Sequence, residues 1–189
     1  MTEGPTPFTV GPGAGRSFAL PTRGCGTVKV GTPDSGGTLS AFELVMESGE
    51  GPGLHVHSRE HELWYVLEGE FRFLLGDALV HQPTGSLAFG PRGMPHTFQN
   101  IGAGTGRLLV ITGPAGLEEF FLEYDRRATG PYDAEAPAGG GPAGRARLCG
   151  PPARAVTGPV TPASAPASGI TIFGHGPGHE LLPTPAITA

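Results

Sequence analysis

The chain has few cysteines, no basic cluster and no long apolar stretch, and each of these absences excludes a class of protein. Its two cysteines, Cys25 and Cys149, belong to no C-x-x-C pair, so we expect buried free thiols rather than a disulfide. Twelve scattered basic residues and a net charge of −5 argue against a nucleic-acid partner. The apolar runs fall well short of the roughly 18 residues of a membrane span. Without a leader-like start either, we expect a cytoplasmic protein.

Glycine and proline are abundant instead, with 33 and 21 residues, and their placement divides the chain. In the first part they separate apolar runs, whereas later they are mixed with alanine in the manner of a linker. The predicted segments are an N-terminal arm (1–22), a barrel with a following short helix (23–125), a Pro/Gly/Ala-rich linker (126–168) and a strand-like tail (169–189). The tail contains His175 and His179, which we interpret as solvated side chains; a strand that packs on the barrel or a partner, or a lid over the site, is the alternative.

Short runs rich in β-branched and aromatic residues alternate with turn signals, which is typical of strands. The predicted strands cover residues 27–30, 38–46, 62–67, 70–75, 86–89 and 106–112. Many short strands with Gly and Pro turns predict an all-β, antiparallel jelly-roll barrel. A short C-terminal helix is predicted at 116–124, because its apolar residues 117, 120, 121 and 124 share one helical face.

Three histidines and one glutamate form the most informative pattern in the chain. His55 and His57 are two residues apart, so on a strand both side chains point to the same face. Glu62 begins the next strand-like run, and His96 follows further downstream. Imidazole with a carboxylate oxygen suits iron, nickel, cobalt, manganese, copper or zinc, and the lack of a nearby cysteine argues against a closed structural zinc site. The pattern predicts one divalent transition metal with open coordination positions.

The same residues carry a resemblance to the cupin superfamily. Residues 53–69, G-L-H-V-H-S-R-E-H-E-L-W-Y-V-L-E-G, resemble the first cupin motif. Residues 85–100 resemble the second, with Gly85, Pro91, Gly93, His96 and Asn100 at the family's spacings. The resemblance implies a small single-domain cupin with the double-stranded β-helix fold. It also implies a homodimer, and metal ligands at His55, His57, Glu62 and His96.

A second resemblance concerns the region after the barrel. Gly116 with the following L-E-E-F-F, and the later run 145–152, R-A-R-L-C-G-P-P, look like the C-terminal segment of quercetin-dioxygenase-like cupins. This similarity favours that subgroup of the family.

The pocket wall is predicted from strand parity. If Glu62 and His96 face inward, so do alternate residues on the same strands, and neighbouring phenylalanines complete an apolar wall. The predicted wall consists of Trp64, Val66, Phe71, Phe73, Phe89 and Phe98. Such a cavity suits a flat aromatic or enolic small molecule. The alternative is that these side chains simply fill the barrel core.

Three functions fit this pattern. In the first, a quercetinase-like dioxygenase, Glu62 is a catalytic base that removes a phenolic or enolic proton before dioxygen reacts. In the second, a non-redox ion polarises a carbonyl in a cyclase or isomerase of secondary metabolism. In the third, the barrel only binds a small molecule. The ligand types do not separate these functions, and the analogy with the quercetin-dioxygenase-like cupins favours the dioxygenase.

Overall fold

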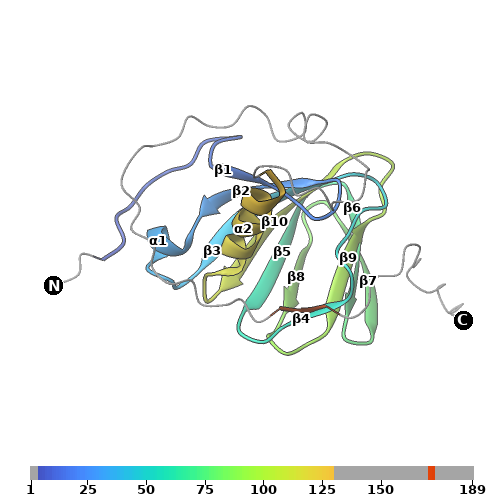
Figure 1. The fold of residues 1–189 in the computed structure, drawn as a ribbon. Coiled ribbons are helices and arrows are strands. Elements are labelled where there is room, and N and C mark those ends of the chain that lie inside the picture. Colours follow the sequence, from blue (N-terminus) through green and yellow to red (C-terminus); the bar gives the residue numbers. More distant parts are fainter. Residues whose placement is uncertain (1–3, 130–169, 173–189) are drawn as a thin grey trace, which may run out of the picture.

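The computed structural model describes residues 4–129 and 170–172, which form two antiparallel sheets with two helices (Figure 1). The six-stranded sheet contains, in spatial order, β1 (Arg16–Ala19), β2 (Cys25–Val30), β3 (Ser40–Met46), β10 (Gly106–Gly113), β5 (His61–Glu68) and β8 (Leu87–Gly90). The five-stranded sheet contains β11 (Ile170–Ile172), β4 (His55–His57), β9 (His96–Asn100), β6 (Glu70–Leu75) and β7 (Ala78–Pro83). The chain alternates between the sheets, so the predicted all-β jelly roll is confirmed.

Alternating side chains explain why these segments form strands around one core. Along β3 every second residue is buried, and β10 repeats the pattern beside it. The inward side chains of Phe42, Leu108 and Val110 are at most 1% exposed. Because successive strand residues point to opposite faces, such alternation places one face of the six-stranded sheet in the core. The opposite face remains partly accessible.

Two glycines of the motif regions are structural. Gly69, between β5 and β6, has φ of 91°, and Gly93, before β9, has φ of 80°. Residues with a Cβ atom rarely adopt such angles. The backbone N–H of Gly93 donates to the carbonyl of His57 at 2.8 Å, so this turn ties β4 to the loop that precedes β9. The turn therefore fixes the relative position of two histidine-bearing strands.

Helix α2 (Leu117–Thr129) packs against β1 and β3 (Figure 1). The Phe121 ring stacks on Phe18 at a centroid distance of 5.1 Å and meets the edge of Phe42 at 5.7 Å. Buried Glu118 accepts hydrogen bonds at 2.6 Å from the backbone N–H and hydroxyl of Thr32, in the short helix α1 (Thr32–Ser35). These contacts hold the apolar face of α2 over one end of the barrel.

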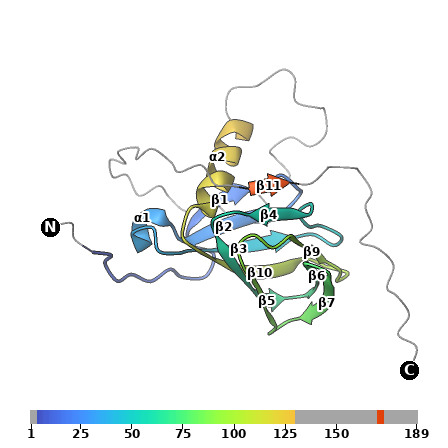
Figure 2. The ribbon, with the colours of Figure 1, turned by 90° about the horizontal axis from the view of Figure 1, so that it is seen from below.

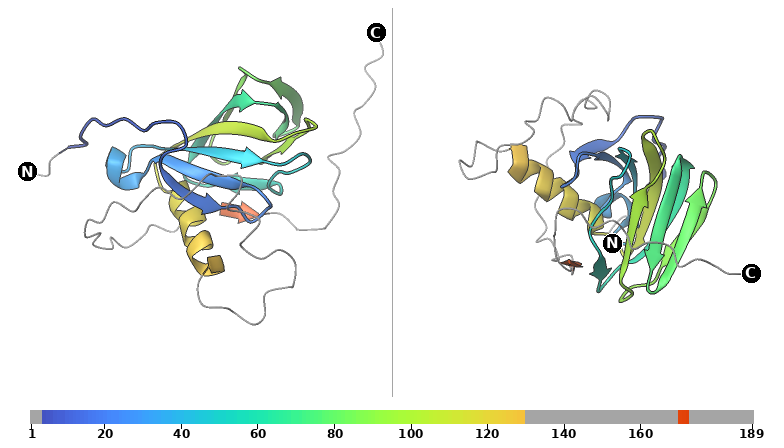
Figure 3. Two further views of the ribbon diagram at one scale, coloured as in Figure 1. Left: turned by 90° about the horizontal axis from the view of Figure 1, so that it is seen from above. Right: turned by 90° about the vertical axis from the view of Figure 1, so that its right-hand side faces the viewer.

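The structure changes several segment boundaries. The predicted arm, 1–22, contributes strand β1, and α2 runs through Thr129 into the predicted linker, 126–168. The rest of that linker lies outside the described residues, as do His175 and His179. From the tail, Ile170–Ile172 forms β11, which pairs with β4 and lies on the same side of the molecule as α2 (Figures 2 and 3).

The expectation of free thiols is wrong for Cys25. This residue, at the start of β2, is disulfide-bonded. Cys149, the chain's other cysteine, lies outside the described residues. Neither of the two helices in the described ranges has the length and apolar character that crossing a membrane requires.

Candidate metal centre

The four predicted ligands come from three strands and both sheets. His55 and His57 lie on β4, and His55 pairs directly with His96 on β9 in the same sheet. Glu62 lies near the start of β5 in the opposite sheet, next to Thr112 of β10 and Gly90 of β8. The inward faces of the two sheets therefore bring together residues that are up to 41 positions apart in sequence.

The ligand atoms form one compact buried group. Oε2 of Glu62 is 3.1 Å from Nε2 of His57 and 3.3 Å from Nε2 of His96. The His55 ring centroid is 4.4 Å from that of His96 and 4.9 Å from that of His57. One ligand atom from each of the four residues lies within 4.8 Å of the others. This spacing places all four donors around a single point.

Two of the histidines are oriented by backbone carbonyls. Nδ1–H of His55 donates to the carbonyl of Gly53 at 2.8 Å, and Nδ1–H of His96 donates to that of Met94 at 2.9 Å. A carbonyl only accepts, so the hydrogen bond assigns the proton to Nδ1 in each ring. Each Nε2 therefore directs a lone pair toward the centre, as a metal ligand must.

The electrostatics of the cluster keep its donors ready to bind a cation. Burial, reinforced by the neighbouring His96, lowers the pKa of His55 to about 4, so this imidazole is neutral at physiological pH. Burial would raise the pKa of Glu62, but close contact with His57 and His96 outweighs burial and lowers that pKa to about 2. A neutral imidazole beside an ionised carboxylate is the protonation state that a divalent metal requires.

The donor set fits a divalent transition metal. Among the described residues, Nε2 of His57, Nε2 of His96 and Oε2 of Glu62 are buried and have no hydrogen-bond partner. Buried polar atoms are costly when unpaired, and a cation at their common centre would satisfy all of them. Imidazole nitrogens with one carboxylate oxygen suit the first-row transition metals named above. His55, His57, Glu62 and His96 would hold such an ion.

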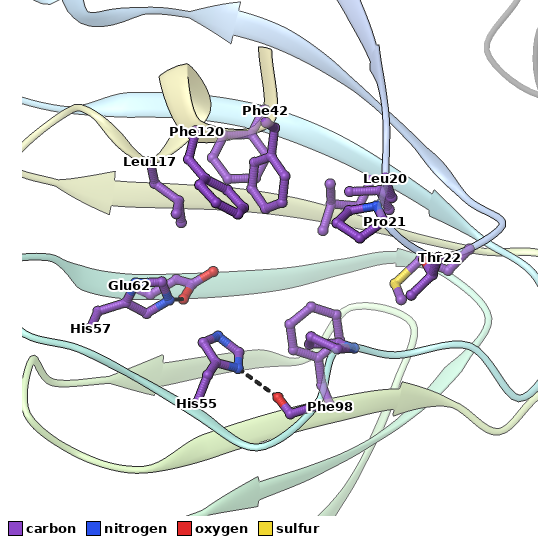
Figure 4. Close-up of a pocket in the computed structure, with 15 residues that line it drawn as sticks. Leu20, Pro21, Thr22, Phe42, His55, His57, Glu62, Phe98, Leu117 and Phe120 are labelled. Atoms are coloured by element: carbon purple, nitrogen blue, oxygen red, sulfur yellow. Dashed lines mark hydrogen bonds and ion pairs between the residues drawn. The ribbon is translucent and has the colours of Figure 1, made fainter. Parts of the chain in front are cut away.

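The cluster opens onto an apolar cavity (Figure 4). His55, His57 and Glu62 form its polar end, whereas the other walls come from β3, β9, α2 and the loops before β2 and β4. The lining residues besides these ligands are Leu20, Pro21, Thr22, Phe42, Leu44, Met46, Pro52, Gly53, Phe98, Leu117, Phe120 and Phe121. Thr22 is the one additional polar side chain in this lining, so the cavity offers a small molecule mostly hydrocarbon contact.

The structure places the six predicted wall residues in the cavity lining, in the barrel core or on the surface. Phe98 is among the residues that line the cavity. Trp64, Val66, Phe71 and Phe73 are at most 1% exposed and belong to the barrel core rather than to the cavity lining. The Trp64 ring nevertheless packs edge-on against His96 at a centroid distance of 5.0 Å. Its position therefore supports a ligand without contacting the cavity.

The prediction that Phe89 lines the pocket is wrong. Its side chain is 49% exposed and stacks on exposed His61 at 5.9 Å. On β8 the inward residues are Ala88 and Gly90, and a Cβ atom at position 90 would lie 2.6 Å from Cη2 of Trp64. The indole fills the space that larger inward residues on β8 would need, so the phenylalanine faces outward.

Strand parity missed the part of the wall outside the barrel strands. Leu20 and Pro21 lie in the loop between β1 and β2, which the sequence placed in the N-terminal arm. Leu117, Phe120 and Phe121 were recognised as the apolar face of a helix but not as cavity residues. The sequence does contain a signal for these wall residues, because an amphipathic helix directly after a barrel must bury its apolar face against that barrel.

Comparisons with known proteins agree with this geometry. Residues 42–112 match the family model described as a cupin domain. The polyketide cyclase RemF from Streptomyces resistomycificus is similar in structure, with 25% identity, a TM-score of 0.50, and coverage of 57% of this chain and 80% of RemF. No curated protein matches the chain in sequence.

Two further solved structures show the same fold at lower identity. KdgF from a Halomonas species is 16% identical with a TM-score of 0.54, covering 60% of this chain and 99% of KdgF. An RmlC-like cupin from Shewanella frigidimarina is 19% identical with a TM-score of 0.52, and the match covers 61% of this chain and 96% of the Shewanella chain.

Proposed function

Residues 42–112 are a cupin domain, and from this premise we propose that the protein is a metal-dependent enzyme acting on a small aromatic or enolic metabolite. One observation carries the proposal: three buried histidines and a buried glutamate converge on one point, and three of the four face an otherwise apolar cavity. A purely structural site would be closed by protein. An opening toward a cavity is the arrangement that lets a substrate reach the ion.

The lining of the cavity narrows the substrate class. No Lys or Arg is among the residues that line it in the described part of the chain. Arg72 instead donates to Gln99 at 2.9 Å, and Arg107 donates to Glu43 at 2.8 Å. A phosphorylated or otherwise anionic substrate would lack a cationic partner there. The lining suits a molecule with an apolar ring body and one or two oxygens at the ligand end.

Glu62 is the residue that we assign to proton transfer. When bound, a divalent ion supplies Lewis acidity to a substrate oxygen, and a redox-active ion also supplies electron transfer with dioxygen. The pKa of Glu62, lowered to about 2, leaves its carboxylate ionised at neutral pH. In the metal-loaded protein the carboxylate would accept a phenolic or enolic proton after swinging away from the ion, which would free Oε2. Leu117 and Phe120 line the same cavity as Glu62 and give its surroundings an apolar character.

For the reaction itself we propose quercetinase-like dioxygenase chemistry. Loss of the enolic proton to Glu62 leaves an electron-rich substrate. Dioxygen then adds to it, a carbon–carbon bond breaks, and both oxygen atoms enter the products. The ligand set and the apolar cavity are compatible with this chemistry. The resemblance of residues 116–121 and 145–152 to quercetin-dioxygenase-like cupins favours it over the cyclase.

A cyclase is the second candidate, and the similarity to the polyketide cyclase RemF favours it. In this reaction the same proton acceptor, Glu62, removes a proton from a carbon between two carbonyl groups. The resulting enolate closes a ring within the same chain, and no dioxygen is consumed.

The decisive experiment measures metal content and oxygen consumption on the same preparation. Plasma mass spectrometry should find about one iron, nickel, cobalt, manganese or copper per chain. An oxygen electrode should then register uptake when flavonols or other enolic aromatics are added to the protein reconstituted with each metal. Zinc without oxygen uptake would overturn the dioxygenase and favour the cyclase. Absence of metal under every condition would overturn the metal-dependent enzyme and leave a binding barrel.

A matched pair of variants tests the role of Glu62. Glu62→Gln removes the proton acceptor with little change in size, and we expect turnover to fall about 100-fold or more. Glu68→Gln, at the exposed end of the same strand, should leave turnover and metal content unchanged. Full activity in Glu62→Gln would contradict the assignment.

A further inference from the structure

A fully buried carboxylate lies next to the ligand cluster and belongs to none of the roles above. Glu60, in the loop between β4 and β5, is 1% exposed. Neither of its carboxylate oxygens has a hydrogen-bond partner among the described residues. Burying an ionised carboxylate is unfavourable unless other groups stabilise it. Its neighbours therefore indicate what the residue does.

Two side chains and one backbone turn surround the Glu60 carboxylate. Oε2 is 4.0 Å from Nδ1 of His57, and Oε1 is 3.9 Å from Nη1 of Arg59. The loop before α2 lies beside the same oxygen, because a Cβ atom at Gly116 would be 4.0 Å from Oε1 of Glu60 and 3.9 Å from Nη1 of Arg59. The carboxylate thus lies between an imidazole of the metal centre and a partly exposed guanidinium.

The three histidines of the centre differ in what their Nδ1 atoms contact. Those of His55 and His96 donate to backbone carbonyls, whereas Nδ1 of His57 has no hydrogen-bond partner in the described part of the chain. The acidic side chain that approaches this atom is Glu60. On the opposite edge of the same ring, Nε2 is 3.1 Å from Glu62. His57 consequently lies between two carboxylates, one in the ligand cluster and one behind it.

We propose that Glu60 is a positioning residue that accepts the Nδ1–H of His57 and so directs the Nε2 lone pair toward the metal. The role of Glu60 in metal binding depends on the proposed metal centre. The proximity of Glu60 to His57 does not depend on a metal. A side-chain rotation that shortens the 4.0 Å separation by about 1 Å forms the hydrogen bond. Arg59 contributes positive charge on the far side of the carboxylate, which offsets part of the cost of burying it.

A carboxylate partner has different consequences from a carbonyl partner. A hydrogen bond to an ionised acceptor is stronger than one to a neutral acceptor, and it increases the basicity of the ring as a ligand. The second carboxylate also brings the formal charge of two glutamates and one divalent ion to zero. Glu60 therefore strengthens cation binding and makes binding of an additional anion to the site less favourable.

The first part of the test needs no metal. Long-range proton–nitrogen correlation spectra of the metal-free, nitrogen-15-labelled protein report which ring nitrogen of His57 carries the proton. Because Nε2 is 3.1 Å from Glu62, that carboxylate competes with Glu60 for the ring proton when no metal is bound. We therefore expect a smaller share of the Nδ1–H form in Glu60→Ala than in the wild-type protein. Equal shares in the two proteins would overturn the proposal.

The second part compares variants by chelator competition with Zn²⁺. We expect Glu60→Ala to weaken Zn²⁺ binding by about 10- to 100-fold and to lose the Nδ1–H preference of His57. Glu60→Gln should retain that preference, because its amide oxygen also accepts a hydrogen bond, and should weaken binding less. Wild-type affinity in folded Glu60→Ala would overturn the proposal.

A control separates positioning from structural support. Glu118→Gln alters another buried glutamate, which accepts hydrogen bonds from Thr32 and Gly116 away from His57. It should lower the melting temperature without changing the His57 tautomer or the Zn²⁺ affinity. An equal loss of affinity in Glu118→Gln and Glu60→Ala would assign Glu60 a structural role and overturn the proposal. If no variant or wild type binds metal, the tautomer result still tests Glu60 while the metal-dependent function fails.

Discussion

His55 and His96 face each other as paired residues of the antiparallel strands β4 and β9. Their ring centroids are 4.4 Å apart, and each ring is oriented by a carbonyl two residues before it in the chain. The register of one strand pair therefore sets the separation of two ligands, while the local backbone sets their tautomers. The chemistry of the centre depends on strand pairing as much as on residue type.

Removal of a central ligand should abolish metal binding without unfolding the barrel. We expect His96→Ala and His57→Ala each to bind Zn²⁺ or Co²⁺ at least about 100-fold more weakly, because each removes one of four donors around a common point. The strand signal in circular dichroism should persist. His61→Ala, which alters an exposed histidine beside the centre, is the control and should bind normally. Full metal occupancy in His96→Ala would contradict the assignment of His96 as a metal ligand.

The structure brings the four candidate ligands together, and part of this arrangement follows from local rules. The i, i+2 spacing of His55 and His57 places both rings on one face of a strand, and the structure has them there. The fold class followed from similar short-range signals. Phe89 shows where such signals fail, since the close packing of Trp64 on Gly90, a residue far from it in sequence, accompanies the inward face of β8 and cannot be read from β8 itself.

The cavity was harder to predict because its walls depend on long-range packing. Leu20 and Phe120 come from opposite ends of the described barrel, and no periodicity within either segment indicates that they share a cavity. Glu60 is a similar case, because strand alternation does not apply in a loop and the neighbouring loop before α2 is distant in sequence. The sequence pattern therefore does not indicate whether Glu60 is buried.

The metal-free protein should lose stability in acid. His55 has a folded-state pKa of about 4 against an ordinary value of 6.5, so between these pH values the unfolded chain binds a proton that the folded state does not. Stability is therefore present above pH 6.5 and is lost as the pH falls toward 4. The expected loss is on the order of 3 kcal/mol. Glu62, with a pKa lowered from 4.5 to about 2, adds a further loss below pH 4.5.

Urea denaturation of the metal-free protein at pH 7, 5.5 and 4 measures this dependence. In His55→Asn the decline between pH 6.5 and 4 should become shallower, whereas His81→Asn, on the outer surface of β7, should follow the wild type. Stability that stays level or increases toward pH 4 would contradict the assignment of a buried neutral imidazole.

Gly90 should tolerate no larger residue. A Cβ atom at this position would lie 2.6 Å from the Trp64 ring, so Gly90→Ala forces a shift in a fully buried core. We expect a decrease in the free energy of unfolding of about 1–3 kcal/mol. Gly104→Ala, where no atom lies within 4 Å of the added Cβ, should change stability by about 0.5 kcal/mol or less. Equal effects of the two substitutions in thermal or urea denaturation would refute the packing argument.

The outer face of β5 and β8 should form a homodimer interface. Tyr65, Leu87 and Phe89 are 40%, 58% and 49% exposed, and Tyr65 pairs with Leu87 across the two strands. An apolar group at a sheet edge is a typical association surface. Light scattering after size exclusion should give the mass of two chains, and Leu87→Glu with Phe89→Glu should give one. Leu39→Glu, at an exposed leucine before β3, is the control. A monomeric wild type would contradict this expectation.

The origin of the ligands in both sheets has a thermodynamic consequence. Three imidazoles belong to β4 and β9, and the carboxylate belongs to β5 in the facing sheet. An ion held by all four is a cross-link between the two halves of the sandwich, and the unfolded chain offers no equivalent site. Each tenfold increase in free metal above the dissociation constant should then add about 1.4 kcal/mol to the free energy of unfolding. The resistance of this barrel to unfolding is thus linked to the metal concentration around it.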